Sequence, residues 1–439
     1  MKKKSIKLWE VAKKIIPGGN MLLSKRPEMF LPNKWPAYYN KAKGCYIYDL
    51  DNTKYLDMCL MGVGTNILGY ANKEVDNAVI KNIKKSNMST LNCQEEVLLC
   101  KELLKINPWA GMVRLARTGG EANAISVRIA RVNCKRGKDH IAICGYHGWH
   151  DWYLSANIKN KKNLDNHLLA GLSTDGVPKE LVGTVHPFMF NDLKSFQELI
   201  SREKKIGIVK MEVHRNFKPS KDFLKGLMKI VKKKKLLLIF DECTSGFRET
   251  FGGIHKKYKV TPDICTFGKA LGNGYAITAV VGKAEIMKNS QASFISSTFW
   301  TERAGPSAAL KTLQIMKREK TWQQISQKGK MIKKRLKKLS KKYKISLNVM
   351  GNDGIPTFTF NSNNNLKYKT FITQEMLKKK ILASNVIYVS IAHKKINIQR
   401  YFSILEKIFK KISDCENNLD NIDNHLEGEI CHQGFQRLN

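Results

Sequence analysis

The sequence predicts an α/β fold, with a mostly parallel sheet in a large domain and a smaller, discontinuous α+β domain. Short apolar runs within residues 141–281 alternate with helical patterns, which is typical of parallel sheets covered by helices on both faces. From about Arg303 onward, long basic helices and a few short strands replace this alternation. We therefore expect a large domain at 71–303, and a small domain at 304–414 that the N-terminal segment 1–70 completes.

The first elements of the chain are a hairpin and two helices. Residues 44–49 alternate in polarity, Asp51 and Asn52 form a turn, and residues 54–57 return, which predicts a β-hairpin. Apolar residues at helical spacing predict amphipathic helices over 74–85 and 94–105.

The middle of the chain carries the elements of the main sheet. Strands are expected at 141–144, 181–185, 206–211, 236–240, 264–267 and 277–281. Helices are expected at 120–132, 192–201 and 222–233. Ligands of such sheets bind beyond the carboxyl ends of the strands, so the residues that follow each strand are candidates for a site.

The C-terminal third predicts the rest of the small domain. Its expected helices cover 304–318, 322–339 and 398–412, and its expected strands cover 356–360 and 386–391. Residues 415–439 are polar and acidic before a short run at 431–435, and we expect them to form a loosely packed extension.

The charge of the chain allows two interpretations. Its 77 Lys and Arg residues outnumber its 37 Asp and Glu residues and give a formal net charge of +40. Such an excess can indicate a nucleic-acid or anionic membrane partner. The lysines are scattered over polar helix faces, however, and no nucleic-acid-binding motif is present. We favour a lysine-rich surface and keep a basic nucleic-acid-binding protein as the alternative from another functional class.

The cysteines and the apolar runs indicate the compartment. The ten cysteines include no C-x-x-C pair, and the first 20 residues contain no secretory apolar region. No apolar run is long enough to cross a bilayer. We therefore expect a reduced cytoplasmic compartment and no membrane partner.

Lys269 and Asp241 carry the strongest chemical signal. Asp241 directly follows the apolar run 236–240, and Lys269 lies among small residues just after the run 264–267. A partly desolvated lysine has a lowered pKa and can form a Schiff base. An acid at the end of a buried strand can keep a pyridine nitrogen protonated. The pair suggests pyridoxal phosphate, whose ring is an electron sink.

Two further motifs could contribute to the same site. Gly119 and Gly120 open a predicted helix, and backbone N–H groups at such a position bind phosphate well; the alternative is a plain helix start capped by Thr118. Tyr146 follows a predicted strand and could stack on a planar ring. His147 and His150 have a spacing that could suit a metal, but Gly148 interrupts the helix and no third ligand is evident.

Taken together and in this order, these motifs resemble the class III, fold-type I aminotransferases that depend on pyridoxal phosphate. The likeness covers nearly the whole chain, from Ile16-Pro17-Gly18-Gly19 to the last helix. It is closest to the glutamate-1-semialdehyde 2,1-aminomutases. The resemblance implies that Lys269 binds the cofactor as a Schiff base and moves the proton, and that Asp241 is the partner of the pyridine nitrogen.

The resemblance also implies roles for other residues around the cofactor. Gly119 and Gly120 match the phosphate-binding turn, Tyr146 the aromatic residue that stacks on the ring, and Glu212 an acid near the ring's polar edge. Thr298 matches a threonine that reaches the phosphate from the neighbouring subunit, which implies a homodimer with shared active sites. The arginine that binds the substrate carboxylate falls near Lys25 and Arg26.

The departures from the family pattern lie mostly on the substrate side. Val213 follows Glu212 where a proline is usual. Gly120 stands where the family usually has serine or threonine, so one hydroxyl for the phosphate is missing. We expect an aminotransferase that transfers an amino group from a small donor to a small carbonyl acceptor through pyridoxamine phosphate. The alternative is the aminomutase itself, which moves the amino group within one substrate.

Overall fold

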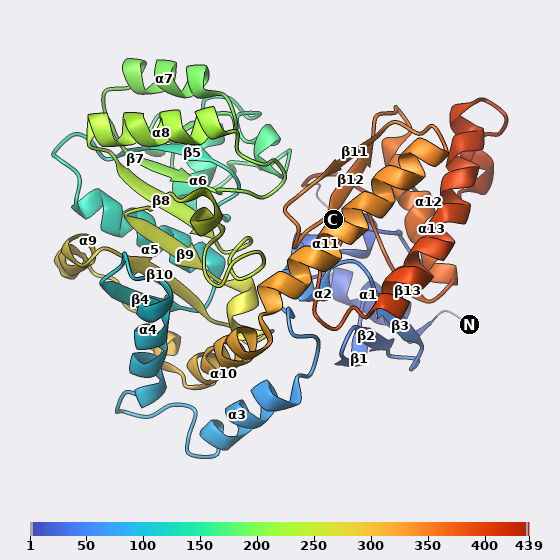
Figure 1. Cartoon of the computed structure of the whole chain (residues 1–439), viewed down its shortest axis with the longest axis horizontal. Helices are drawn as coiled ribbons and strands as arrows, with labels where there is room; N and C mark the ends of the chain where they lie inside the picture. The colour runs from blue at the N-terminus through green and yellow to red at the C-terminus, as the bar shows by residue number, and fades with distance from the viewer. Residues whose placement is uncertain (1–2, 436–437, 439) are drawn as a thin grey trace. The chain divides into compact units, whose positions relative to one another are not determined.

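The computed structural model describes residues 3–435 and 438. These residues form two compact units (Figure 1). The large unit is Lys73–Gln323. The terminal unit joins both ends of the chain, Met1–Asn72 and Gln324–Asn439.

Within the described residues, the large unit is built on a seven-stranded sheet with the order β4-β10-β9-β8-β7-β5-β6. The strands are β4 (Met112–Ala116), β5 (His140–Cys144), β6 (Val185–Pro187), β7 (Ile206–Met211), β8 (Leu237–Glu242), β9 (Ile264–Phe267) and β10 (Thr278–Gly282). Strands β5 to β9 pair in parallel, and β10 is antiparallel to both β9 and β4. Every residue of β7 and β9 is buried, as expected for central strands covered on both faces.

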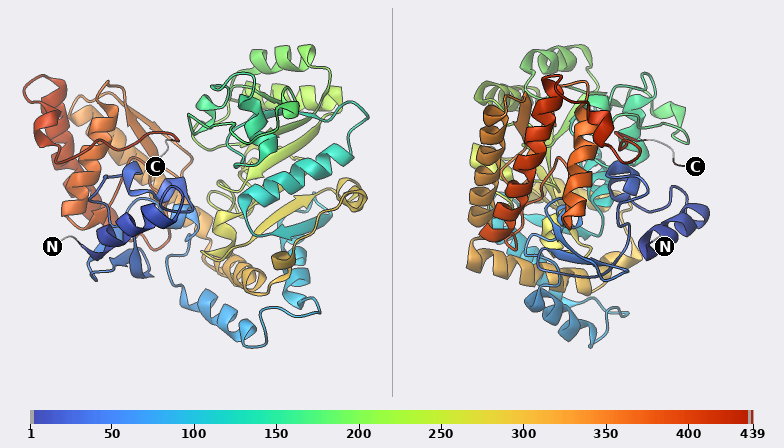
Figure 2. Two further views of the ribbon diagram at one scale, coloured as in Figure 1. Left: turned by 180° about the vertical axis from the view of Figure 1, so that it is seen from behind. Right: turned by 90° about the vertical axis from the view of Figure 1, so that its right-hand side faces the viewer.

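The helices of the large unit cover this sheet. They are α3 (Lys73–Ile83), α4 (Gln94–Ile106), α5 (Gly119–Val132), α6 (Asp151–Leu154), α7 (Leu193–Arg202), α8 (Lys221–Lys234), α9 (Ala284–Lys288) and α10 (Ala304–Glu319). Helix α5 lies across one face of the sheet (Figure 2). The start of α8 is set by Ser220, whose hydroxyl accepts the N–H of Phe223 at 3.1 Å, an N-cap that satisfies one orphan donor.

The terminal unit contains the N-terminal hairpin. Strands β2 (Tyr46–Asp49) and β3 (Lys54–Asp57) pair antiparallel, β1 (Tyr39–Lys43) flanks β2, and the short β13 (Ile381–Leu382) adds to β3 in parallel. Asp49 shapes the turn, because its Oδ1 accepts the N–H groups of Asp51 and Thr53 at 3.0 and 2.8 Å.

The remaining elements of this unit come mainly from the C-terminal part of the chain. They are α1 (Lys4–Ile15), α2 (Met61–Gly64), α11 (Thr321–Lys342), β11 (Leu347–Met350), β12 (Thr357–Phe360), α12 (Asn365–Lys378) and α13 (Lys395–Glu416). Strands β11 and β12 form a separate antiparallel pair. Helix α13 buries one apolar face, which includes Tyr401, Leu405 and Phe409.

Several strand assignments differ from the sequence prediction, and the short strands β1, β11 and β13 were not predicted. Residues 181–185 are mostly turn, and the strand there begins only at Val185. Residues 386–391 form one isolated bridge, between Val386 and Thr357, instead of a strand. Strand β4 was not predicted, because Arg114 interrupts its apolar run; the Arg114 guanidinium donates to the carbonyl of Ile295 at 2.5 Å.

The expected boundary at 303/304 is also wrong, since the units divide at Gln323 and Gln324. Helix α10 packs against α3 and α4 and so belongs to the large unit. Within the described part of the extension, 415–435 and 438, the buried side chains are Cys415, Ile422 and Cys431. Cys431 is buried and its N–H donates to the hydroxyl of Thr370 at 3.0 Å.

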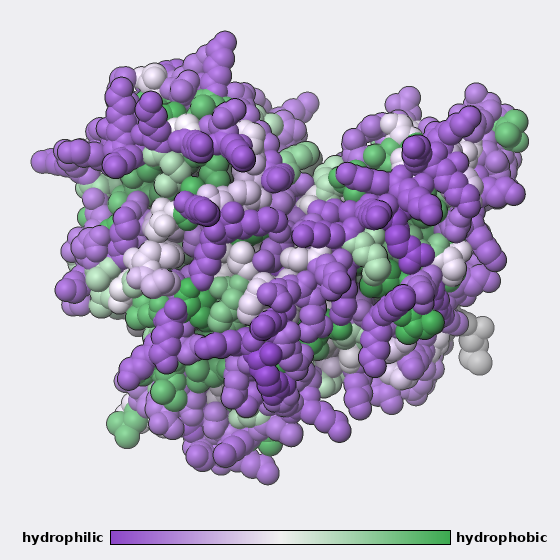
Figure 3. Space-filling model, viewed as in Figure 1, coloured by the Kyte–Doolittle hydropathy of each residue, from purple (hydrophilic) through white to green (hydrophobic). Residues whose placement is uncertain are grey.

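Hydrophilic side chains cover most of the face seen in Figure 3, with smaller hydrophobic areas between them. Several surface lysines pair with nearby carboxylates, as Lys411 does with Asp420 at 2.8 Å. Exposed pairs of this kind contribute little to stability. None of the helices in the described part of the chain is long and apolar enough to span a bilayer.

Candidate active site

The two residues with the strongest signal in the sequence lie at the same edge of the sheet. Asp241 of β8 is in register with Thr266 of β9, and Lys269 follows soon after the end of β9. Since β8 and β9 are parallel, both strands end at this edge, where ligands of such sheets bind.

Three loops of the large unit converge at this edge around Cys243. A Cβ atom placed on Gly119 would lie 3.8 Å from the Cys243 Sγ, and one on Gly268 would lie 3.5 Å from it. The glycine turn at the start of α5, the end of β8 and the loop that carries Lys269 therefore lie side by side. The structure thus brings Gly119, Asp241 and Lys269 into one site.

Asp241 is buried and accepts hydrogen bonds on both oxygens. Its Oδ2 lies 2.8 Å from the Asn123 Nδ2 and 2.9 Å from the His147 Nδ1. Its Oδ1 accepts the N–H of Cys243 at 3.0 Å and the hydroxyl of Thr266 at 3.1 Å. An ionised carboxylate only accepts, so the His147 Nδ1 carries the proton of this bond.

These partners keep Asp241 charged. Burial alone would raise the pKa of Asp241, but the hydrogen bond from His147 and the nearby charge of Lys210 hold that pKa well below its usual value. The Thr266 hydroxyl lies 3.3 Å from the Asn123 Oδ1 and can donate there instead. That rotation would leave a lone pair of Asp241 for a protonated ring nitrogen.

Lys269 is held in an uncommon backbone conformation. Its φ is +38°, in the left-handed region that is costly for a residue with a side chain. The Lys269 Nζ donates to the Thr244 Oγ1 at 2.8 Å. Strain of this kind persists where the surrounding structure requires it, and at Lys269 it directs a primary amine at the edge where Asp241 lies.

Helix α5 begins at the two predicted phosphate-binding glycines. Thr118 is the N-cap, because its Oγ1 accepts the N–H of Glu121 at 3.2 Å, and Glu121 in return accepts the N–H of Thr118 at 2.7 Å. This capping box leaves the N–H groups of Gly119 and Gly120 at the helix start. Thr118 therefore does cap the helix, and the N–H groups of Gly119 and Gly120 remain available to an anion.

Tyr146 and Glu212 are adjacent at the ends of β5 and β7. The N–H of Tyr146 donates to the Glu212 Oε2 at 3.1 Å. Gly145 permits this approach, since its φ is +116° and a Cβ there would lie 2.8 Å from that same oxygen. Burial raises the pKa of the Tyr146 hydroxyl, so the ring stays uncharged and can lie against a planar ligand.

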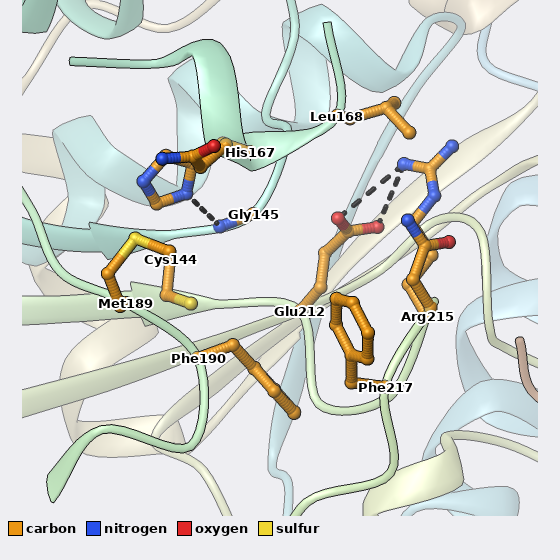
Figure 4. Close-up of a pocket in the computed structure, with 11 residues that line it drawn as sticks. Cys144, Gly145, His167, Leu168, Met189, Phe190, Glu212, Arg215 and Phe217 are labelled. Atoms are coloured by element: carbon orange, nitrogen blue, oxygen red, sulfur yellow. Dashed lines mark hydrogen bonds and ion pairs between the residues drawn. The ribbon is translucent and has the colours of Figure 1, made fainter. Parts of the chain in front are cut away.

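A cavity of about 120 Å³ opens beside Glu212 (Figure 4). Arg215 lines it and pairs with Glu212, its Nη1 lying 3.2 Å from the Glu212 Oε1. His167 lines it too, and its Nδ1 accepts the N–H of Gly145 at 3.0 Å. The remaining walls include the apolar side chains of Met189, Phe190 and Phe217.

The other three predicted site residues are Thr298, Lys25 and Arg26. Thr298 begins a short 3₁₀ turn, Thr298–Thr301, and is exposed. Lys25 and Arg26 belong to the terminal unit, where a Cβ on Gly18 would collide with the Arg26 guanidinium. Their roles remain predictions.

Sequence reasoning missed several residues that contact or lie near Asp241 or Lys269. They are Asn123, His147, Lys210, Thr244 and Thr266. His147 was considered only as a metal ligand, and its partner is a carboxylate. Lys210 did carry a signal, because it is the one charged residue in the run 206–211; it is fully buried and its Nζ donates to the Ser126 Oγ at 3.0 Å.

These features fit a planar, phosphorylated pyridine that carries an aldehyde. Asp241 would provide a buried negative charge for a ring nitrogen, Lys269 a primary amine for the aldehyde, and the start of α5 backbone N–H groups for the phosphate. An imidazole nitrogen, the His150 Nδ1, is buried beside this helix start without a hydrogen-bond partner among the described residues. The residues present therefore fit pyridoxal phosphate.

Comparison with known proteins identifies the family. The chain matches the family model for class III aminotransferases over residues 32–409. It is 34% identical over 380 residues to the 3-aminobutyryl-CoA aminotransferase of Cloacimonas acidaminovorans, covering 84% of this chain and 87% of that one. It is 28% identical over 429 residues to the glutamate-1-semialdehyde 2,1-aminomutase of Saccharolobus islandicus, covering 93% and 98%.

A solved structure shows the same fold. The FumI protein of Sphingopyxis sp. MTA144, in its pyridoxal phosphate internal aldimine form, matches with a TM-score of 0.84 and 20% identity over 96% of this chain and 100% of that one. The predicted α/β fold is thereby confirmed. The chain belongs to the class III aminotransferases, enzymes whose cofactor is pyridoxal 5′-phosphate.

Proposed function

We propose that this enzyme transfers an amino group from a small amino donor to a small carbonyl acceptor, with Lys269 as the residue that moves the proton. The observation that carries the proposal is the placement of Lys269 and the charged Asp241 at one edge of parallel strands. Pyridoxal phosphate supplies the electron sink for this chemistry when it is bound.

The side chains divide the work between holding the cofactor and moving a proton. Asp241, oriented by Asn123 and His147, would bind the ring nitrogen in its protonated form. Tyr146 would lie against the ring, and Glu212 would face its polar edge. The Thr244 hydroxyl, 2.8 Å from the Lys269 Nζ, would hold the amine in place while it carries a proton between the substrate's α-carbon and the cofactor.

The substrate side is less determined than the cofactor side. We propose that Lys25 or Arg26 binds an acidic group of the substrate, because both are cations near the N-terminal Gly18-Gly19 turn. The relatives include both an aminotransferase and an aminomutase. Because the departures from the aminomutase pattern lie mostly on the substrate side, we favour transfer between two molecules, with intramolecular transfer as the second candidate.

We also propose a homodimer in which Thr298 contributes to the phosphate site of the neighbouring subunit. Along the chain, Thr298 lies between two exposed aromatic side chains, Phe294 and Phe299, at 85% and 68% exposure, and aromatic residues are enriched at protein interfaces. The ten cysteines are all free thiols, as is usual in a reducing compartment such as the cytoplasm.

The first experiment concerns Lys269. Borohydride reduction of the yellow protein should abolish its visible absorbance and leave the cofactor covalently attached to Lys269, as peptide mapping would show. A Lys269→Ala protein should keep its fold by circular dichroism and lose amino transfer by a factor of at least about 10³. A variant that keeps the full rate would show that another group moves the proton.

The second experiment distinguishes amino transfer between two molecules from amino transfer within one substrate. An aminotransferase given only an amino donor stops after one half-reaction and remains in the pyridoxamine form, which absorption spectra report. An aminomutase turns over its single substrate without a second partner. Continued turnover of a lone diamino or semialdehyde substrate would replace the first candidate with the second.

The third experiment tests the shared site. Thr298→Ala should weaken cofactor retention about tenfold, the effect of losing one hydrogen bond to a charged group. Ser296, an exposed residue just before the same turn, provides the matched control variant Ser296→Ala. Equal retention in the wild type and in both variants would contradict the proposed role of Thr298.

A further inference from the structure

Gly120 leaves a space at the phosphate-binding turn that another residue fills. It is the second residue of α5 and has no side chain to offer a ligand there. A Cβ atom at Gly120 would lie 2.6 Å from the Cε1 and 2.9 Å from the Nδ1 of His150. The imidazole of His150 therefore occupies the position that the side chain of residue 120 would take.

The backbone and a neighbouring ring hold this imidazole in place. The carbonyl of His150 accepts the N–H of Tyr153 at 2.9 Å and that of Leu154 at 3.1 Å, at the start of α6. The ring of Trp149 stacks on the imidazole with 4.6 Å between the ring centroids. The His150 side chain does not cap its own helix, so its ring is available for another role.

The Nδ1 of His150 is poised to donate to a ligand. This atom is buried and, among the residues that the structure describes, no group accepts or donates a hydrogen bond to it. A buried polar atom of this kind costs free energy until a partner arrives. The positive end of the α5 dipole and the N–H groups of Gly119 and Gly120 favour an anion at this position.

We propose that His150 binds the phosphate of pyridoxal phosphate by donating the Nδ1–H, and so replaces the hydroxyl that a serine or threonine at position 120 would provide. This inference rests on the family's cofactor and the geometry around Gly120, and it holds whether the enzyme is an aminotransferase or an aminomutase. In this role His150 would hold the cofactor by its phosphate and would take no part in the chemistry of amino transfer.

The test compares two ligands that differ only in the phosphate. The dissociation constants of pyridoxal phosphate and of pyridoxal are measured by equilibrium dialysis against the full-length protein freed of cofactor. For His150→Ala, the constant for pyridoxal phosphate should rise about tenfold or more, while that for pyridoxal should stay within about twofold. An equal loss for both ligands, or no loss for either, would overturn the proposal.

A rescue variant distinguishes phosphate binding from structural support. In the wild type, Gly120→Ser should weaken binding because its Cβ collides with His150. In the His150→Ala background, the same substitution should restore the affinity for pyridoxal phosphate to within about threefold of the wild type, since the vacated space admits a hydroxyl. Failure of this rescue would contradict the proposed replacement.

The control removes an imidazole elsewhere in the large unit. His186→Ala affects a ring that stacks on His140, and it should leave both dissociation constants unchanged. The urea midpoints of all variants, measured without ligand, would show whether any change in affinity comes from unfolding. The binding measurement does not depend on turnover. Its result can therefore contradict the role of His150 without contradicting the proposed function.

Discussion

His167 should make the cavity side of the active site sensitive to acid. Its Nδ1 accepts the N–H of Gly145 at 3.0 Å, and Gly145 directly precedes Tyr146. An imidazole that accepts through Nδ1 has its proton on the other ring nitrogen. It has to release the Gly145 hydrogen bond before Nδ1 can be protonated. Burial, together with the nearby charge of His147, lowers the pKa of His167 from 6.5 to about 4.

The size of the effect follows from linkage. The unfolded chain takes up this proton near pH 6.5 and the folded chain only near about 4, so the contribution of His167 to stability is complete above about 6.5 and is lost as the pH falls toward 4. The interval of about 2.5 pH units corresponds to about 3.5 kcal/mol, at about 1.4 kcal/mol per unit. Below about pH 4 both states are protonated and the loss ends.

The assay compares the wild type with His167→Asn, whose amide oxygen can accept the Gly145 N–H but does not titrate. Urea unfolding, followed by tryptophan fluorescence between pH about 4.5 and about 7.5, gives the free energy of unfolding of each protein. The wild type should lose between about 2 and 3 kcal/mol relative to the variant across this range. Parallel pH profiles for the two proteins would refute the argument.

Two other substitutions test the site and the packing. Asp241→Asn keeps the shape of the side chain and removes its charge, so the half-reaction with an amino donor, followed by stopped-flow absorbance, should slow about 100-fold or more; an unchanged rate would show that the carboxylate charge is not needed. Gly329→Ala in α11 places a Cβ against the backbone carbonyl of Asp353 and should lower stability by about 3 kcal/mol in thermal unfolding. The control Gly428→Ala, which has no atom within 4 Å of its Cβ, should melt as the wild type does.

The residues that sequence reasoning found are those whose chemistry is encoded locally. Asp241 could be recognised because an acid directly follows an apolar strand, and Lys269 because small residues surround it after the next strand. The two glycines could be recognised because they begin a helix. In each case a few consecutive residues hold the whole signal.

The residues that it missed become partners only through long-range packing. Asn123 lies 118 residues and His147 lies 94 residues from Asp241 along the chain, yet both contact the same oxygen. His150 and Gly120 likewise come from different segments, the turn before α6 and the start of α5. No local pattern reports such contacts.

The sequence by itself determined the alternation of apolar strands and helices, the position of the amine and the acid, and the pair of glycines that begins a helix. It could do so because side-chain periodicity and helix-start chemistry act over a few residues. Only the tertiary structure decided the strand order, in which β5 lies between β6 and β7, and the move of α10 into the large unit. Those outcomes depend on which apolar faces bury each other. The charge of Asp241 and the placement of His150 beside Gly120 depend on contacts between residues far apart in the chain.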